Sequence, residues 1–129
     1  PGDVDAAVAA ALVVQSAYLS AGQRCTCARR LIVRDGDHAA LLDRVTALID
    51  RLIVGAPFDD PQPFMGPVVS NAAADRLQAQ LHRLGGTVLR PLDRPDPARP
   101  FLTPALVDMT GLPPHDEELF GPVLQITRV

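Results

Sequence analysis

Aromatic residues are scarce in this chain of 129 residues, which has no tryptophan, one tyrosine and four phenylalanines. Large aromatic side chains contribute much of the buried area of an ordinary domain, so this set is small for a self-sufficient core. The sequence also lacks an initiating methionine and closes on a strand-like stretch, residues 123–129. We therefore expect a piece of a longer protein; the alternative is a small alanine-rich domain.

An excess of charge of one sign is missing too. Twelve basic and fifteen acidic side chains are interspersed and give a formal net charge of −3. Without a dominant basic face, nucleic acid and anionic membrane surfaces are not expected as partners. The longest apolar run, residues 6–14, is too short to span a bilayer, and the acidic start is unlike a secretory signal. We expect a cytoplasmic globular protein.

Cysteine occurs only twice, as Cys25 and Cys27. Two cysteines do not make a disulfide scaffold, and a bridge between residues two apart is strained. A metal site needs about four ligands, and the three histidines are scattered along the sequence, so no metal site is expected. Two buried, inert thiols and one reactive thiol remain as alternatives.

Helices alternate with short apolar strands along the sequence. Capping residues and glycine stops predict helices from Asp3 or Asp5 to about Ser20, from Asp37 to Gly55, and from Ser70 or Asn71 to Gly85. Apolar runs predict extended segments at residues 29–33, 87–90, 102–109 and 123–129. Proline-rich residues 56–69 and 91–100 are predicted as loops. The alternation is typical of an α/β fold with a mainly parallel sheet in a single domain.

Apolar spacing predicts which helix faces pack inward. In the first helix Val4, Val8, Leu12 and Leu19 lie near one face, and the alanines suggest close packing on several sides rather than one. The second helix has a stripe of Leu41, Val45, Leu48 and Leu52, and the third has Leu77, Leu81 and Leu84.

Cys25 follows a glycine-terminated helix and lies among polar residues rather than on an apolar stripe. A loop between a helix and a buried strand often presents a functional side chain. The charge of Arg24 favours the thiolate, whereas the C-terminal end of the preceding helix opposes it. A nucleophilic Cys25 therefore needs a nearby base or a positively charged cofactor to activate it.

Three segments, in this order, resemble the aldehyde dehydrogenase superfamily. "SAGQRCTCARR", residues 20–30, resembles its nucleophile loop, Gly-Gln-x-Cys after an alanine-rich helix. "DEELFGPVLQI", residues 116–126, is similar to its Glu-Glu-x-Phe-Gly-Pro segment, and residues 55–70 resemble the segment between the two. A lone Gly-Gln-x-Cys is a weak signal, but the ordered set covers nearly the whole chain and is strong.

The resemblance implies that residues 1–129 are part of the nucleophile-bearing catalytic domain of an NAD(P)-dependent enzyme. Cys25 would be the catalytic nucleophile, forming a thiohemiacetal and then a thioester. Glu118 would bind hydroxyls of the nicotinamide ribose, and Phe120 would pack near the nicotinamide. The implied coenzyme is NAD or NADP, the substrate a small aldehyde, and the full-length protein a homo-oligomer. In detail the segments are most similar to semialdehyde dehydrogenases of bacterial arginine catabolism.

Each implied role has a structural alternative. Glu117 and Glu118 could form a solvated acidic turn, and Phe120 could belong to the core. For the whole chain, the main alternative is a non-catalytic α/β interaction module of the same ancestry. A thiol-redox or metal protein that uses Cys25 and Cys27 is a weaker one.

The family's general base, dinucleotide-binding domain and oligomerisation strand are expected in segments that this sequence does not contain. We therefore predict that a chain of residues 1–129 alone does not oxidise aldehydes. The measurement is the absorbance of reduced nicotinamide over time, with a Cys25→Ser chain as the blank. Turnover above this blank would contradict the prediction.

Overall fold

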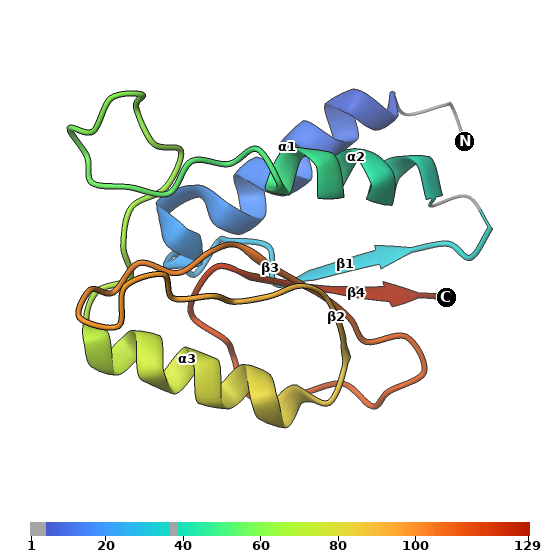
Figure 1. The fold of residues 1–129 in the computed structure, drawn as a ribbon. Coiled ribbons are helices and arrows are strands. Elements are labelled where there is room, and N and C mark those ends of the chain that lie inside the picture. The colour runs from blue at the N-terminus through green and yellow to red at the C-terminus, as the bar shows by residue number, and fades with distance from the viewer. Residues whose placement is uncertain (1–4, 37–38) are drawn as a thin grey trace.

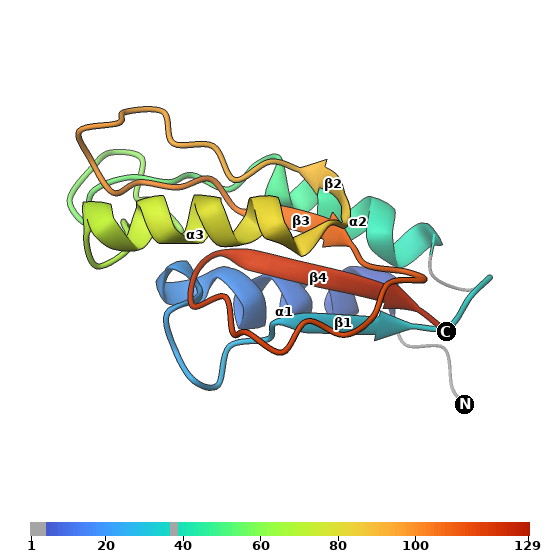
Figure 2. The ribbon, with the colours of Figure 1, turned by 90° about the horizontal axis from the view of Figure 1, so that it is seen from below.

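A four-stranded sheet lies between helices in the computed structural model, which describes residues 5–36 and 39–129. Helices α1 and α2 cover one face of the sheet and α3 covers the other (Figure 1, Figure 2). The elements in chain order are α1 (Ala6–Tyr18), the short helix η1 (Leu19–Gly22), β1 (Arg30–Val33), α2 (Ala39–Ile49), α3 (Asn71–Leu84), β2 (Thr87–Arg90), β3 (Ala105–Asp108) and β4 (Val123–Arg128).

The sheet has the order β1-β4-β3-β2. Strand β4 pairs in parallel with both β1 and β3, and β2 is an antiparallel edge strand on β3. The predicted α/β fold with a mainly parallel sheet is confirmed. The central strands β3 and β4 are buried on both faces, as expected where helices cover both sides of a sheet.

Alternating side chains of the central strands divide the core into two clusters. Leu106, Leu124 and Ile126 pack with α1 and α2. Val107 and Val123 pack on the other face, against α3. Each helix layer is therefore fixed to the sheet by its own apolar contacts.

Capping residues begin α1 and α3, and end α3, where the sequence predicts them. The side chains of Asp5 and Ser70 each accept a backbone N–H at the start of α1 and α3. Gly85 ends α3 in the left-handed conformation, with φ of 75°. The other proposed caps, Asp3 and Asp37, lie outside the described residues.

Helix α2 ends at Ile49, so the predicted end at Gly55 is wrong. Beyond the helix the chain becomes extended: Val54 forms a parallel bridge with Met65, and the carbonyl of Ile53 accepts the N–H of Phe64 at 2.9 Å. This pairing with a later segment ends the helix earlier than the local apolar spacing predicts.

The predicted inward face of α1 is also wrong. Val8, Leu12 and Leu19 are exposed, by 55%, 60% and 41%. The buried side chains of α1 are Ala10, Val14, Ala17 and Tyr18. Small alanines let the helix approach α2 and the sheet closely, so the larger apolar residues face outward. Val4 lies outside the described residues.

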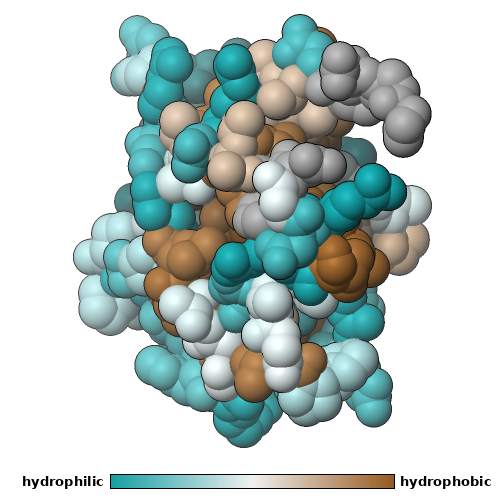
Figure 3. Space-filling model, turned by 90° about the vertical axis from the view of Figure 1, so that its right-hand side faces the viewer, coloured by the Kyte–Doolittle hydropathy of each residue, from teal (hydrophilic) through white to brown (hydrophobic). Residues whose placement is uncertain are grey.

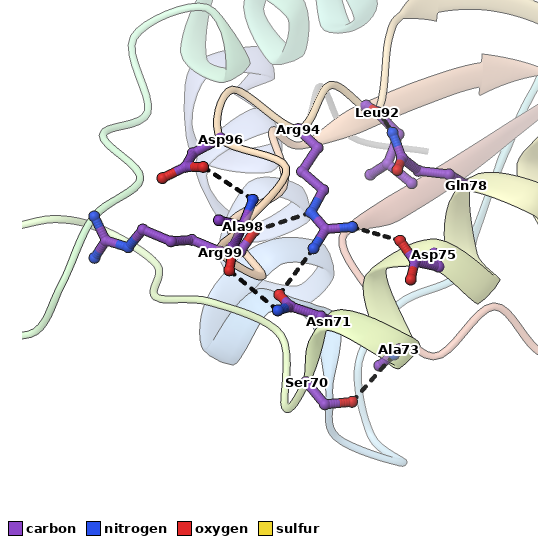
Figure 4. A network of polar contacts seen from close by, with 10 residues as sticks. All are labelled: Ser70, Asn71, Ala73, Asp75, Gln78, Leu92, Arg94, Asp96, Ala98 and Arg99. Carbon is purple, nitrogen blue, oxygen red and sulfur yellow. Dashed lines mark hydrogen bonds and ion pairs between the residues drawn. The ribbon is translucent and has the colours of Figure 1, made fainter.

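The proline-rich loop at residues 91–100 has no helix or strand, as predicted, but it is fixed to the start of α3. Arg94 forms an ion pair with Asp75 and donates to the side-chain oxygen of Asn71 at 2.8 Å and to the carbonyl of Arg99 at 2.9 Å (Figure 4). Because the Arg94 side chain is only 8% exposed, this network orders the loop from within.

The surface mixes apolar and polar side chains. On the face where β1 and β4 end, apolar groups form separate patches among polar ones (Figure 3). Exposed apolar residues of the chain include Ile32 on β1, Leu112 and Val129. None of the helices in the described ranges is long and apolar enough to span a membrane.

Tyr18 joins the end of α1 to the sheet. Its side chain is fully buried, and its hydroxyl donates to the carbonyl of Ala105, the first residue of β3, at 2.9 Å. Burial raises the pKa of the Tyr18 phenol, so the hydroxyl keeps its proton and remains a donor. The bond holds the helix at the point where the chain turns toward Cys25.

Replacing Tyr18 with phenylalanine leaves the buried carbonyl of Ala105 without this donor. We predict that Tyr18→Phe lowers the free energy of unfolding by about 1–2 kcal/mol. Urea unfolding followed by circular dichroism measures the change. Val8→Ala on the exposed face of α1 is the control and should stay within about 0.5 kcal/mol of the wild type. An unchanged Tyr18→Phe variant would show that the bond contributes nothing.

Candidate active site

A left-handed bend connects α1 to the loop that carries Cys25. Ser20, Ala21 and Gly22 all have positive φ, of 59°, 53° and 65°. For each residue other than glycine this conformation costs about 1–2 kcal/mol. Ala21 is nevertheless buried, so packing around the bend maintains it. Strain of this kind persists where the surrounding structure requires one course of the chain.

The bend rests directly on the Phe-Gly-Pro turn at residues 120–122. A Cβ atom on Gly22 would lie 2.2 Å from the carbonyl oxygen of Gly121. A Cβ atom on Gly121 would lie 2.4 Å from Cδ1 of Leu77, on α3. Two backbones and a leucine are therefore stacked without space for another carbon atom, and only glycine fits either position.

Gln23 attaches the same loop to the segment around residues 66–69. Its Oε1 accepts the N–H of Val69 at 2.8 Å. Its Nε2 donates to the carbonyls of Pro67 and Ser20, at 3.4 and 3.2 Å. Gln23 was not among the predicted site residues, although its place in the Gly-Gln-x-Cys pattern was the available signal.

Cys25 lies in a tight turn that is closed by the N–H of Cys27, which donates to the carbonyl of Arg24 at 3.1 Å. Cys25 is exposed, Cys27 is half-buried, and neither forms a disulfide. The alternative of two buried thiols is therefore wrong for Cys25. Its role as a nucleophile stays a prediction.

The two neighbouring glutamates have different partners. Glu117 accepts a hydrogen bond from Nε2 of Gln80 at 2.6 Å and forms an ion pair with Arg83 at 3.5 Å, both from α3. The bond from Gln80, helped by the charge of Arg83, lowers the pKa of the Glu117 carboxyl. Glu118 instead pairs with Arg29 at 3.4 Å and keeps 56% of its side chain exposed. Glu117 thus anchors the turn to α3, while Glu118 remains accessible.

Arg29 connects the Cys25 loop with the turn that carries Glu118 and Phe120. Phe120 is 47% exposed, so the alternative that it belongs to the core is wrong. The guanidinium of Arg29 lies 5.4 Å from the centre of the Phe120 ring, and its Nη2 donates to the carbonyl of Arg24 at 2.9 Å. The neighbouring Arg30 is exposed and donates to the carbonyl of His115.

The structure thus brings the predicted site residues into one region. Cys25 is exposed on one segment, Glu118 and Phe120 are exposed on the other, and Arg29 contacts both segments. An exposed carboxylate two residues from an exposed aromatic ring fits a ribose and a nicotinamide, because a carboxylate accepts two hydroxyls and a ring packs on a flat heterocycle. No group of three or more histidine, cysteine or acidic residues in the described parts of the chain could hold a metal ion.

Comparison with known sequences finds relatives of the chain. A sequence model described as the aldehyde dehydrogenase family matches residues 2–129. N-succinylglutamate 5-semialdehyde dehydrogenase of Novosphingobium aromaticivorans is 52% identical in an alignment of 125 positions, which covers 94% of this chain and 26% of that protein. The protein of the same name from Sphingopyxis alaskensis is 53% identical over 129 residues, covering 97% of this chain and 27% of its own length. The chain therefore spans about a quarter of the length of these relatives.

Solved structures share the fold. A 1-pyrroline-5-carboxylate dehydrogenase from Thermus, solved with bound NAD, superposes with a TM-score of 0.85 at 34% identity, covering 97% of this chain and 25% of that one. An NADP-dependent glyceraldehyde-3-phosphate dehydrogenase from Bacillus halodurans, solved with NADP, gives 0.83 at 32% identity, covering 100% of this chain and 27% of that one.

The contact between Gly22 and Gly121 generates a stability prediction. Gly22→Ala adds a methyl group where the backbone of Gly121 already lies, so we expect a loss of about 2–3 kcal/mol or more in the free energy of unfolding. Gly111→Ala is the matched control: Gly111 also has a positive φ, of 79°, but nothing lies within 4 Å of its added Cβ. Urea unfolding of both variants separates the clash from the cost of the dihedral angle. Equal losses would mean that the contact does not constrain the chain.

Proposed function

The chain belongs to the aldehyde dehydrogenase family, and from this premise we propose that its protein oxidises an aldehyde to a carboxylate with NAD or NADP, using Cys25 as the nucleophile. The observation that carries the proposal is the placement of Cys25. It is exposed in a tight turn, and that turn is attached through Arg29 to the accessible side chains of Glu118 and Phe120.

Cys25 acts in two stages in this proposal. Its thiolate attacks the aldehyde carbon and forms a thiohemiacetal, whose oxyanion can accept the backbone N–H of Cys25 itself. A nicotinamide coenzyme supplies, when bound, the acceptor for the hydride that leaves this carbon. The resulting thioester is hydrolysed by water, which releases the carboxylate and the free thiol. The base that activates the water is expected from outside residues 1–129.

Glu118 and Phe120 are proposed to hold the coenzyme. The carboxylate of Glu118 would accept hydroxyls of the nicotinamide ribose, and the ring of Phe120 would pack beside the nicotinamide. The Thermus relative solved with NAD and the Bacillus relative solved with NADP support a nicotinamide coenzyme. They leave the choice between NAD and NADP open.

N-succinylglutamate 5-semialdehyde is the proposed substrate, and arginine catabolism the proposed pathway. The support is the name shared by relatives that are about half identical over nearly the whole chain. This substrate carries two carboxylates, and Arg24 is an exposed cation immediately before Cys25. Arg24 is therefore proposed to attract the substrate toward the nucleophile.

Thiol labelling of the full-length protein tests the role of Cys25. We expect iodoacetamide to modify Cys25 before the half-buried Cys27, with activity lost in proportion to the modification. Cys25→Ser should lower kcat for N-succinylglutamate 5-semialdehyde by at least about a thousandfold, because no other group replaces the thiolate.

Cys27→Ala is the matched control for Cys25→Ser and should retain activity. Assays use a panel of semialdehydes, with the highest kcat/KM expected for N-succinylglutamate 5-semialdehyde. Equal labelling of both cysteines, or activity that survives Cys25→Ser, would contradict the proposed nucleophile. A full-length protein that oxidises no member of the panel would favour a non-catalytic interaction module.

A further inference from the structure

We infer that Arg29 is a positioning residue, which holds Glu118 and Phe120 in the orientation that binds the coenzyme and attaches them to the loop of Cys25. The inference rests on the proposed function, because it concerns the residues that are proposed there to hold the nicotinamide and its ribose.

The burial of Arg29 is the first observation. Its side chain is 13% exposed, whereas the next residue, Arg30, is exposed. Arginine is rarely so buried, and a buried guanidinium is unfavourable unless it has partners of suitable charge and geometry. The contacts that Arg29 makes therefore have to account for its position.

Three contacts hold the guanidinium, and they come from two segments far apart in sequence. Nη2 donates to the carbonyl of Arg24, in the Cys25 loop, at 2.9 Å. The same nitrogen lies 3.4 Å from Oε1 of Glu118. The face of the Phe120 ring lies under the guanidinium carbon, at 5.4 Å from the ring centre. Arg29 thus contacts both side chains that are proposed to bind the coenzyme.

Two donors of Arg29 are not used by the contacts described above. Its Nε and Nη1 atoms are buried and have no hydrogen-bond partner among the described residues. Here the guanidinium is planar and lies against a ring, an arrangement that a lysine ammonium cannot reproduce while also reaching a carbonyl and a carboxylate.

The consequence concerns the free energy of binding. Glu118 and Phe120 are both about half exposed, so their side chains would be free to rotate without Arg29. Fixing a mobile side chain when a ligand binds lowers affinity. Arg29 removes this cost in advance, and its loss should weaken the binding of the coenzyme more than that of the aldehyde.

The test uses the full-length protein with Arg29→Met, Arg29→Lys and the control Arg83→Met. Arg83 pairs with the neighbouring Glu117 in a similar way but is exposed, and in the described part of the chain it forms no hydrogen bond or ion pair with Glu118 or Phe120. Fluorescence titration with NADH and NADPH gives the Kd of the reduced coenzyme that the wild type binds more tightly. We expect Arg29→Met to raise this Kd about tenfold, equivalent to 1.4 kcal/mol, and Arg29→Lys to raise it about threefold.

Steady-state kinetics should also show a larger effect on the coenzyme than on the aldehyde. The KM for the coenzyme is expected to rise in Arg29→Met, while the KM for the aldehyde stays within about twofold and Arg83→Met behaves as the wild type. Thermal melting of each variant shows whether it is folded. If Arg29→Met does not fold, Arg29→Lys, which keeps the charge, carries the test.

A double-mutant cycle separates positioning from general stability. If Arg29 acts through Glu118, Arg29→Met should raise the Kd of the coenzyme much less in the Glu118→Gln background than in the wild type. The smaller increase that remains would come from the lost contact between Arg29 and the ring of Phe120. Fully additive effects on Kd would overturn the inference, as would an unchanged Kd in folded Arg29→Met. A wild type that oxidises no aldehyde would defeat the proposed function itself, whereas an active wild type with a normal Arg29→Met defeats only this inference.

Discussion

The close approach of two glycine backbones determines the rest of the candidate site. Gly22 ends the left-handed bend after α1, and a Cβ there would lie 2.2 Å from the carbonyl oxygen of Gly121. Gly121 in turn lies on Leu77 of α3 without room for a side chain. Because interiors are close-packed, this stack fixes the distance between the segment that carries Cys25 and the turn that carries Glu118 and Phe120.

Polar contacts around the stack then fix the orientation of both segments. Gln23 holds the Cys25 loop to residues 67 and 69, Glu117 holds the turn to α3, and Arg29 connects the loop with the turn. These bonds, together with Tyr18 behind the bend, offset the conformational strain of Ser20 and Ala21. The strained bend is maintained because each of its neighbours is held from another element.

Local signals in the sequence were sufficient for most of the fold. Asp5, Ser70 and Gly85 act through their immediate neighbours, and the parallel sheet follows from apolar runs separated by helices. The end of α2 could not be predicted in this way, because it depends on Val54 pairing with Met65. The exposed face of α1 escaped prediction because alanine spacing, and not that of the larger residues, decides which side packs closely.

In the candidate site, too, some features could be predicted from the sequence and others depend on contacts that form only in the folded chain. The motif resemblance pointed to Cys25, Glu118 and Phe120, and the structure leaves all three accessible. It gave no role to Glu117, since only the folded chain puts Gln80 and Arg83 beside that residue. Nor did it distinguish Arg29, just before β1, from Arg30, the first residue of β1, because only the folded chain shows which of the two side chains lies against the turn.

A crystal structure of the full-length protein with bound nicotinamide coenzyme tests the central claim most directly. We expect the backbone of Gly22 still to lie against Gly121. We also expect the coenzyme's ribose and nicotinamide to contact Glu118 and Phe120, with the sulfur of Cys25 facing the nicotinamide. A coenzyme bound away from these side chains, or a separation of the two glycine backbones, would contradict it.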